Sequence, residues 1–129
     1  MGILDSIYDA ISALRISKTG KQEHRRKLIE KEAKIGAKLF GPIPAGRNRS
    51  FFCLDRKTWV WHESWIDENG QKHQVTTRYT LYPTTILKTQ NDVQMPMTIQ
   101  ELETLTQAVK AYYPMIARKV YGVTVPTSA

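Results

Sequence analysis

The apolar positions of the first 40 residues recur at intervals of three and four, which is the period of an α-helix. Residues 2–16 carry one such stripe and residues 21–40 carry a second. Gly41-Pro42 stops the second pattern, because proline cannot continue a helix. The chain is therefore expected to begin with a helical pair.

The second helix is expected to have two chemically different sides. One side carries four lysines, Lys27, Lys31, Lys34 and Lys38. The opposite side carries the residues expected to pack inward: Leu28, Ile29, Ala33, Gly36 and Phe40. Glu32 falls within the apolar arc and does not fit the pattern. Glycine inside a helix costs about 1 kcal/mol relative to alanine, so Gly36 predicts the close approach of another element.

Residues 49–90 alternate between side-chain types and predict an antiparallel meander of three or four strands. Asn69-Gly70 is a strong hairpin signal, and folding there pairs Trp65 with Gln74 and Trp61 with Arg78.

An upstream turn at Arg56-Lys57 would pair Phe52 with Trp61 and Leu54 with Trp59. One sheet face would then carry Phe52, Leu54, Trp59, Trp61, Glu63, Trp65 and Arg78. The other would carry Phe51, Cys53, Val60, His62, Ile66, Val75, Thr77, Tyr79 and Leu81. Because both faces are rich in apolar groups, either helices cover both faces or one face is a binding surface.

The last predicted helix spans residues 98–121. Thr98 and Glu101 form a capping box at its start, and Pro114 should kink or divide it. We expect one α+β domain over residues 1–129: a helical basic N-terminal segment (2–40), then a β-meander with the kinked C-terminal helix packed on the sheet (49–121).

Positive charge is concentrated in one segment. The chain has a net charge of +7, and eleven Lys and Arg against three Asp and Glu lie between Arg15 and Arg49. A basic surface of this kind commonly meets phosphate, an anionic membrane or an acidic protein, although it can also be only a solvated helix face.

No catalytic or metal-binding motif is present in the sequence. His62 and Glu63 are adjacent on a strand and point to opposite faces, so they cannot act as an acid–base pair. An enzyme would need distant residues such as His62, His73 and Tyr79 to meet in a pocket. His62, His73 and Cys53 make a weak metal set. We predict no catalytic residue, no metal and no cofactor.

Trp61, Glu63 and Arg78 form a candidate aromatic platform in the predicted register, on which nucleic-acid bases could stack. A structural role for the same three residues, as a cross-strand support in a tryptophan-rich core, is the favoured interpretation.

Several runs resemble an uncharacterised family of small proteins from ultra-small, host-dependent candidate-phylum bacteria. They are GAKLFGP at 36–42, FFCLD at 51–55, TWVWHESW at 58–65 and TTRY at 76–79. The resemblance covers roughly residues 25–121 and implies a bacterial cytoplasmic protein, with no assigned activity. The single cysteine also favours the cytoplasm.

We therefore predict a non-enzymatic cytoplasmic module that binds RNA or a ribonucleoprotein through its basic N-terminal helix. The predicted contacts are Lys27, Lys31, Lys34 and Lys38, with Arg25, Arg26, Arg47 and Arg49 beside them. The alternative is a protein-interaction or assembly subunit, self-associating or peripheral to the inner membrane face, in which the apolar first helix is a contact surface.

Overall fold

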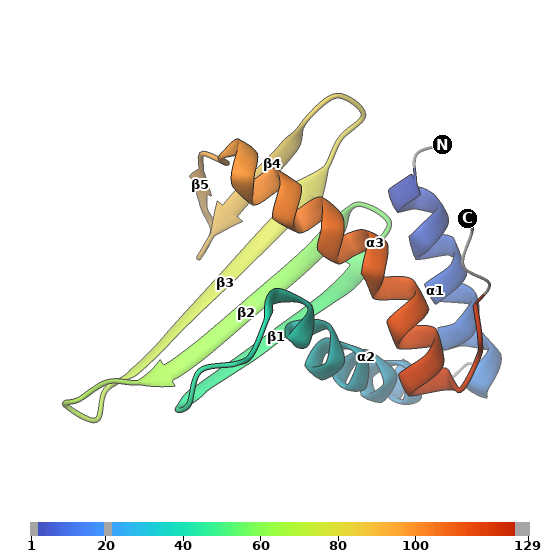
Figure 1. Ribbon diagram of the computed structural model, residues 1–129, viewed down its shortest axis with the longest axis horizontal. Helices are drawn as coiled ribbons and strands as arrows, with labels where there is room; N and C mark the ends of the chain where they lie inside the picture. The colour runs from blue at the N-terminus through green and yellow to red at the C-terminus, as the bar shows by residue number, and fades with distance from the viewer. Residues whose placement is uncertain (1–2, 20–21, 126–129) are drawn as a thin grey trace.

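The computed structural model describes residues 3–19 and 22–125, with side chains for 7–15 and 23–125. Within these ranges the chain forms three α-helices, one 3₁₀ helix (η1) and five strands (Figure 1). In chain order they are α1 (Ile3–Thr19), α2 (Gln22–Gly36), η1 (Ala37–Phe40), β1 (Arg47–Asp55), β2 (Thr58–Ile66), β3 (Lys72–Leu81), β4 (Ile86–Gln90), β5 (Val93–Met95) and α3 (Ile99–Tyr121). The predicted α+β class is confirmed.

The strands form one antiparallel meander in the order β1-β2-β3-β4-β5. The count is five rather than the predicted three or four, because β5 returns along β4 after a tight turn. Asn91 and Asp92 occupy that turn with φ angles of 49° and 67°. Asn and Asp tolerate positive φ, so this pair was a usable hairpin signal that the sequence prediction missed.

The predicted register between β2 and β3 is wrong by one residue. Trp61 faces Thr77 across the strands, not Arg78. The cause is the turn: the amide of Gly70, at φ 78°, donates to the carbonyl of Asp67, which centres the hairpin on Asn69 and moves each β3 partner by one position. A shift of one residue moves every side chain of a strand to the other face.

The β1–β2 register is also shifted, because an irregularity between Cys53 and Asp55 makes Phe51 the partner of Trp61. Since side chains alternate along each strand, the face packed against α3 carries Phe51, Cys53, Trp59, Trp61, Tyr79 and their register partners. His62 and Arg78 lie on the opposite face.

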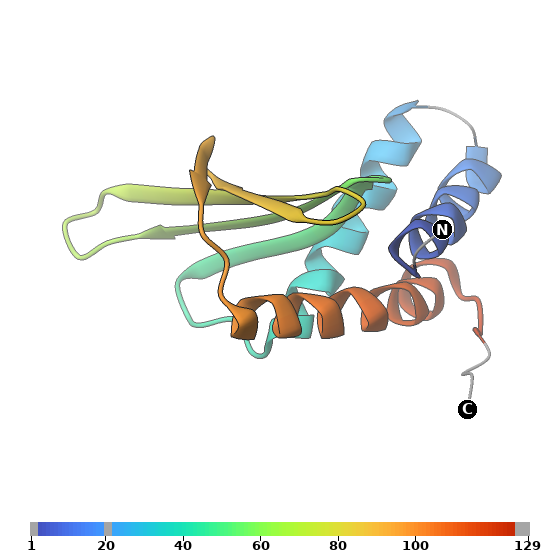
Figure 2. The same cartoon turned by 90° about the horizontal axis from the view of Figure 1, so that it is seen from above.

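Helix α3 covers one face of the sheet, and α1 and α2 lie at the end of the sheet beside β1 (Figure 2). The core between α3 and the sheet is aromatic. Trp59 stacks on Phe51 with 5.3 Å between ring centroids, and Tyr112 contacts Trp59 edge-on at 5.0 Å. Gly36 is buried there, and a β-carbon on it would collide with the carbonyl oxygen of Phe51. The close approach predicted at Gly36 is confirmed.

Helix α3 starts as predicted. Thr98 is its N-cap, and its hydroxyl accepts a hydrogen bond from the amide of Glu101 at 3.0 Å. The helix runs through Pro114 without a break, so it is not divided, and its course changes direction between its orange and red halves in Figure 1. None of the described helices is long and apolar enough to cross a bilayer.

Candidate functional site

Four exposed lysines follow one side of α2 and η1, as the sequence predicts: Lys27, Lys31, Lys34 and Lys38. We call this row the lysine ridge. Among the described residues, none of the four forms an ion pair. Arg26 beside them is exposed and Arg25 is half-buried. Among the described residues, the positive charge of the ridge is therefore not tied up in an ion pair.

The inner side of α2 holds a buried charged cluster that the sequence pattern did not predict. Glu32 is fully buried and accepts hydrogen bonds from Arg15 at 2.8 and 3.0 Å. The hydroxyls of Tyr112 and Tyr121 donate to the same carboxylate at 2.9 and 2.7 Å, and Arg15 also donates to the carbonyl of Cys53 at 2.8 Å. This buried carboxylate cluster joins α1, α2, β1 and α3.

Burial and neighbouring charge shift the pKa values of the groups around Glu32. Burial opposes the charge on Arg15, but the hydrogen bonds and charge of Glu32 outweigh it and raise the pKa of the guanidinium. Burial raises the pKa of Tyr112 and Tyr121, and the negative charge of Glu32 adds to the effect. Burial also raises the pKa of the Cys53 thiol to about 12, so it stays a thiol rather than a reactive thiolate.

The predicted aromatic platform is wrong in one member. Trp61 and Glu63 share a face, but Arg78 is exposed on the other one because of the register shift. The cation over Trp61 is Arg49 instead, with its guanidinium carbon 4.9 Å from the ring centroid. Arg49 also donates to Glu63 at 3.2 Å.

Arg47 repeats this arrangement one step along the strand. Its guanidinium lies 4.3 Å from the ring centroid of Trp65 and donates to Glu63 at 2.9 Å. Trp65 stacks in turn on His73 at 5.4 Å. Arg47 and Arg49 were predicted beside the lysines, but they are tied to the sheet by Glu63 and by aromatic rings. With the correct register, which places Arg47 opposite Trp65 and Arg49 opposite Glu63, the sequence would have shown this.

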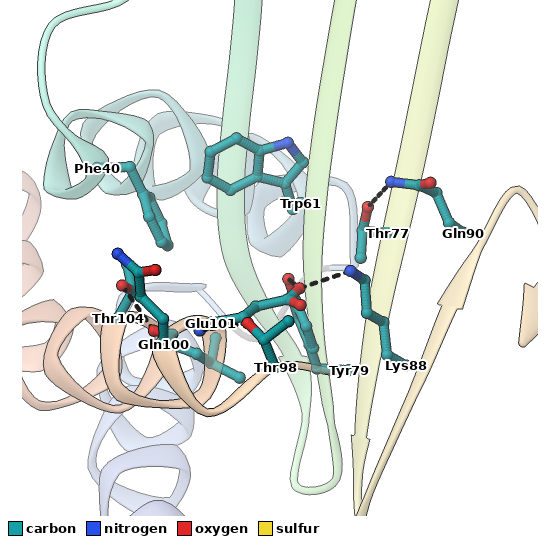
Figure 3. A pocket seen from close by; sticks show the side chains of 11 residues that line it. Phe40, Trp61, Thr77, Tyr79, Lys88, Gln90, Thr98, Gln100, Glu101 and Thr104 are labelled. Carbon is teal, nitrogen blue, oxygen red and sulfur yellow. Dashed lines mark hydrogen bonds and ion pairs between the residues drawn. The ribbon is translucent and has the colours of Figure 1, made fainter. Parts of the chain in front are cut away.

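A cleft of about 450 Å³ opens between the start of α3, strands β2–β4 and η1 (Figure 3). We call it the α3 cleft. Phe40 and Trp61 form one wall, with ring centroids 4.5 Å apart in an edge-to-face contact. Its polar lining includes Tyr79, Lys88, Gln90, Gln100 and Glu101. No sequence motif marks the cleft, because its lining comes from five separate elements.

The charges within the α3 cleft compensate each other. Glu101 pairs with Lys88 at 2.7 Å and accepts a hydrogen bond from the hydroxyl of Tyr79 at 2.8 Å. Burial opposes ionisation of Glu101, but these two partners outweigh it and hold the pKa of its carboxyl below the ordinary value. Burial and the bond to Glu101 raise the pKa of Tyr79, so its hydroxyl remains a donor at neutral pH.

The histidines do not assemble a catalytic or metal site. His62 lies on the opposite sheet face from His73 and Tyr79, so these three residues do not meet in one pocket. His62 is bonded to Thr76 at 2.9 Å and His73 to Asp67 at 2.7 Å. Within residues 3–19 and 22–125, no three His, Cys, Asp or Glu side chains are grouped to hold a metal ion.

Comparison with known proteins gives no relative. No family model, no curated protein and no solved structure matches this chain. The resemblance to the candidate-phylum family thus stays a prediction, and the functional argument rests on the geometry of the lysine ridge and the α3 cleft.

Proposed function

We propose that this protein is a non-enzymatic module that binds RNA, free or within a ribonucleoprotein, through the lysine ridge. The supporting observation is that four exposed lysines without an ion pair among the described residues line one side of α2 and η1. From Lys27 to Lys38 the ridge is about 16 Å long at the rise of an α-helix. That length matches several successive phosphates of one strand.

The surface of α2 and η1 suits a polyanion better than a single acidic side chain. Six Lys and Arg side chains lie between residues 22 and 40, against two exposed carboxylates, Glu23 and Glu30. Lysines on flexible stems contact phosphates without reading the bases, so this surface supplies affinity and little sequence preference.

Binding of a fluorescein-labelled single-stranded RNA, followed by anisotropy, tests the proposal. Four phosphate contacts to a single strand predict a loss of affinity of about 50-fold between about 50 and 200 mM salt, because each contact releases condensed counterions. The absence of any RNA or DNA binding at low salt would end the proposal.

A matched pair of variants separates the lysine ridge from general basicity. Replacing Lys27, Lys31, Lys34 and Lys38 with glutamine should abolish the salt-sensitive binding. Replacing four exposed lysines elsewhere, Lys57, Lys72, Lys110 and Lys119, removes the same charge and should retain most of it. Equal losses in both variants would mean that net charge, and not the ridge, attracts the RNA.

The alternative, an assembly subunit, has one observation in its favour. A groove of about 530 Å³ beside the β3–β4 turn exposes Tyr82, Ile99 and Leu102. The first helix gives it less support, because Ile7 and Ile11 are buried within the protein. Sedimentation with and without anionic liposomes tests this alternative. A monomer that ignores the liposomes would exclude both self-association and membrane attachment.

A further inference from the structure

We infer that the α3 cleft is a binding site for an unpaired nucleobase. This inference rests on the proposed function and names the part of the RNA that the lysine ridge does not contact. The volume of about 450 Å³ falls in the range of about 300–1,000 Å³ that is usual for small-ligand sites. Phe40 and Trp61 supply an aromatic wall, and every base has an aromatic face that can stack on such side chains.

The polar groups of the α3 cleft suit a neutral, planar ligand. The Lys88–Glu101 pair leaves no excess charge to attract a phosphate. Gln90 uses its amide nitrogen on Thr77 at 3.3 Å, and Gln100 is exposed at the rim (Figure 3). A glutamine amide both donates and accepts, which is the combination that the edges of nucleobases present.

The last lysine of the ridge and one side chain of the aromatic wall of the α3 cleft are both in η1. Lys38 and Phe40 are two residues apart in η1, about 4 Å along a 3₁₀ helix. Arg49 lies over Trp61 and donates to the carbonyls of Ala37 at 3.5 Å and Gly41 at 3.4 Å, so it ties η1 to the sheet side of the cleft. Lys38 and Phe40 point to different sides of η1, so a strand with a phosphate on Lys38 passes around η1 to bring a base to the aromatic wall.

Base insertion requires a single strand, because a paired base has its edge occupied and its faces stacked. The lysine ridge alone would bind single strands and duplexes alike. The α3 cleft thus adds a preference for single-stranded RNA.

A nucleoside titration tests the cleft without the ridge, because adenosine carries no phosphate. In ¹⁵N-labelled protein, adenosine should move the indole N–H signal of Trp61 and leave that of the buried Trp59 in place. Gln100→Ala should weaken this binding about fivefold, as expected for one lost hydrogen bond. Gln107→Ala, an exposed glutamine of the same helix outside the cleft, should not weaken it. A Trp61 signal that stays fixed, or an affinity that Gln100→Ala leaves unchanged, would overturn the inference.

RNA binding then separates this inference from the proposed function. Wild-type protein should bind a single strand at least fivefold more tightly than a duplex of the same sequence, and Gln100→Ala should reduce that ratio. If the lysine-ridge variant loses both RNAs but the wild type binds them equally, the cleft inference fails and the proposed function stands. If the ridge variant binds both RNAs as the wild type does, the proposed function fails, and the adenosine titration alone decides the cleft.

Discussion

Helix α2 carries charged residues on two opposite sides, and the two sides have opposite surroundings. On the inner side, Glu32 is fully buried and hydrogen-bonded by Arg15, Tyr112 and Tyr121. On the outer side, continuing into η1, the four lysines of the ridge are exposed and have no ion-pair partner among the described residues. The inner charge is used to hold the fold, whereas the outer charges remain available to another molecule.

The contrast shows that the partners of a charged side chain, more than its type, decide what it does. A buried carboxylate is tolerable only when its lone pairs are satisfied, and Glu32 achieves this with residues from two other elements, α1 and α3. Exposed lysines contribute little to stability because water already solvates them. We expect changes on the inner side to affect folding and changes on the outer side to affect binding.

The largest expected effect is that of Glu32→Gln. The substitution preserves size but leaves Arg15 buried without a counter-charge, so it should lower the free energy of unfolding by about 3–5 kcal/mol. Urea denaturation followed by tryptophan fluorescence measures this loss. Glu30→Gln, at an exposed position of the same helix, should change the free energy by no more than about 0.5 kcal/mol. Similar values for the two variants would contradict the contrast between the two sides.

High pH should weaken the inner side of α2. Tyr112 and Tyr121 have raised pKa values in the folded protein, so above about pH 10 the unfolded chain loses their protons first. The contribution of these two tyrosines is then fully present below pH 10 and falls above it, by up to about 1.4 kcal/mol per pH unit for each tyrosine. The Cys53 thiol, whose pKa is about 12 in the folded state, adds a fall of the same sign that begins near its ordinary pKa of 9.0.

Denaturation at a series of pH values checks this dependence. A double variant with Tyr112→Phe and Tyr121→Phe should be less stable at neutral pH but should show a flatter decline above pH 10. A decline as steep as in the wild type would mean that other groups cause it.

Gly36→Ala should destabilise the protein by about 1–3 kcal/mol, the usual cost of overpacking a core. The new methyl group would collide with the backbone of Phe51, and it would lie 2.9 Å from the ring of Tyr112. Backbone cannot give way as a flexible side chain does, so the gain of about 1 kcal/mol from helix propensity is outweighed. Thermal unfolding measures the change, and a raised melting temperature would refute the close packing at this residue.

The smallest effect on stability is expected on the outer side. Replacing all four ridge lysines with glutamine should change the free energy of unfolding by less than about 1 kcal/mol, because exposed charges stabilise weakly. A much larger loss, again measured in urea, would show that the lysines are structural and would remove them as an interaction surface.

Local signals in the sequence predicted local structure well. The capping box at Thr98 predicted the start of α3, and the helical period predicted the exposed lysines. The role of Glu32 could not be predicted in this way, since Tyr112 lies 80 residues away in the chain. The hydrophobic pattern could show only that Glu32 was misplaced in an apolar arc.

The sheet register was predicted incorrectly because it depends on the geometry of one turn. Asn69-Gly70 correctly predicted a hairpin, but the turn formed from Asp67 to Gly70 moved every pair by one residue. That single step put Arg78 on the wrong face and concealed the role of Arg49. The α3 cleft was beyond prediction for a related reason, since its walls meet only when η1, the sheet and α3 are placed together.

The salt dependence of RNA binding tests the central claim most directly. The slope of log K against log salt for a single-stranded RNA should be shallower by about 3 in the lysine-ridge variant than in the wild type, because each lost phosphate contact removes about 0.7. The matched variant with glutamine at residues 57, 72, 110 and 119 should keep a slope close to that of the wild type. Equal slopes in the two quadruple variants would contradict the claim that the outer side of α2 is the RNA-binding surface.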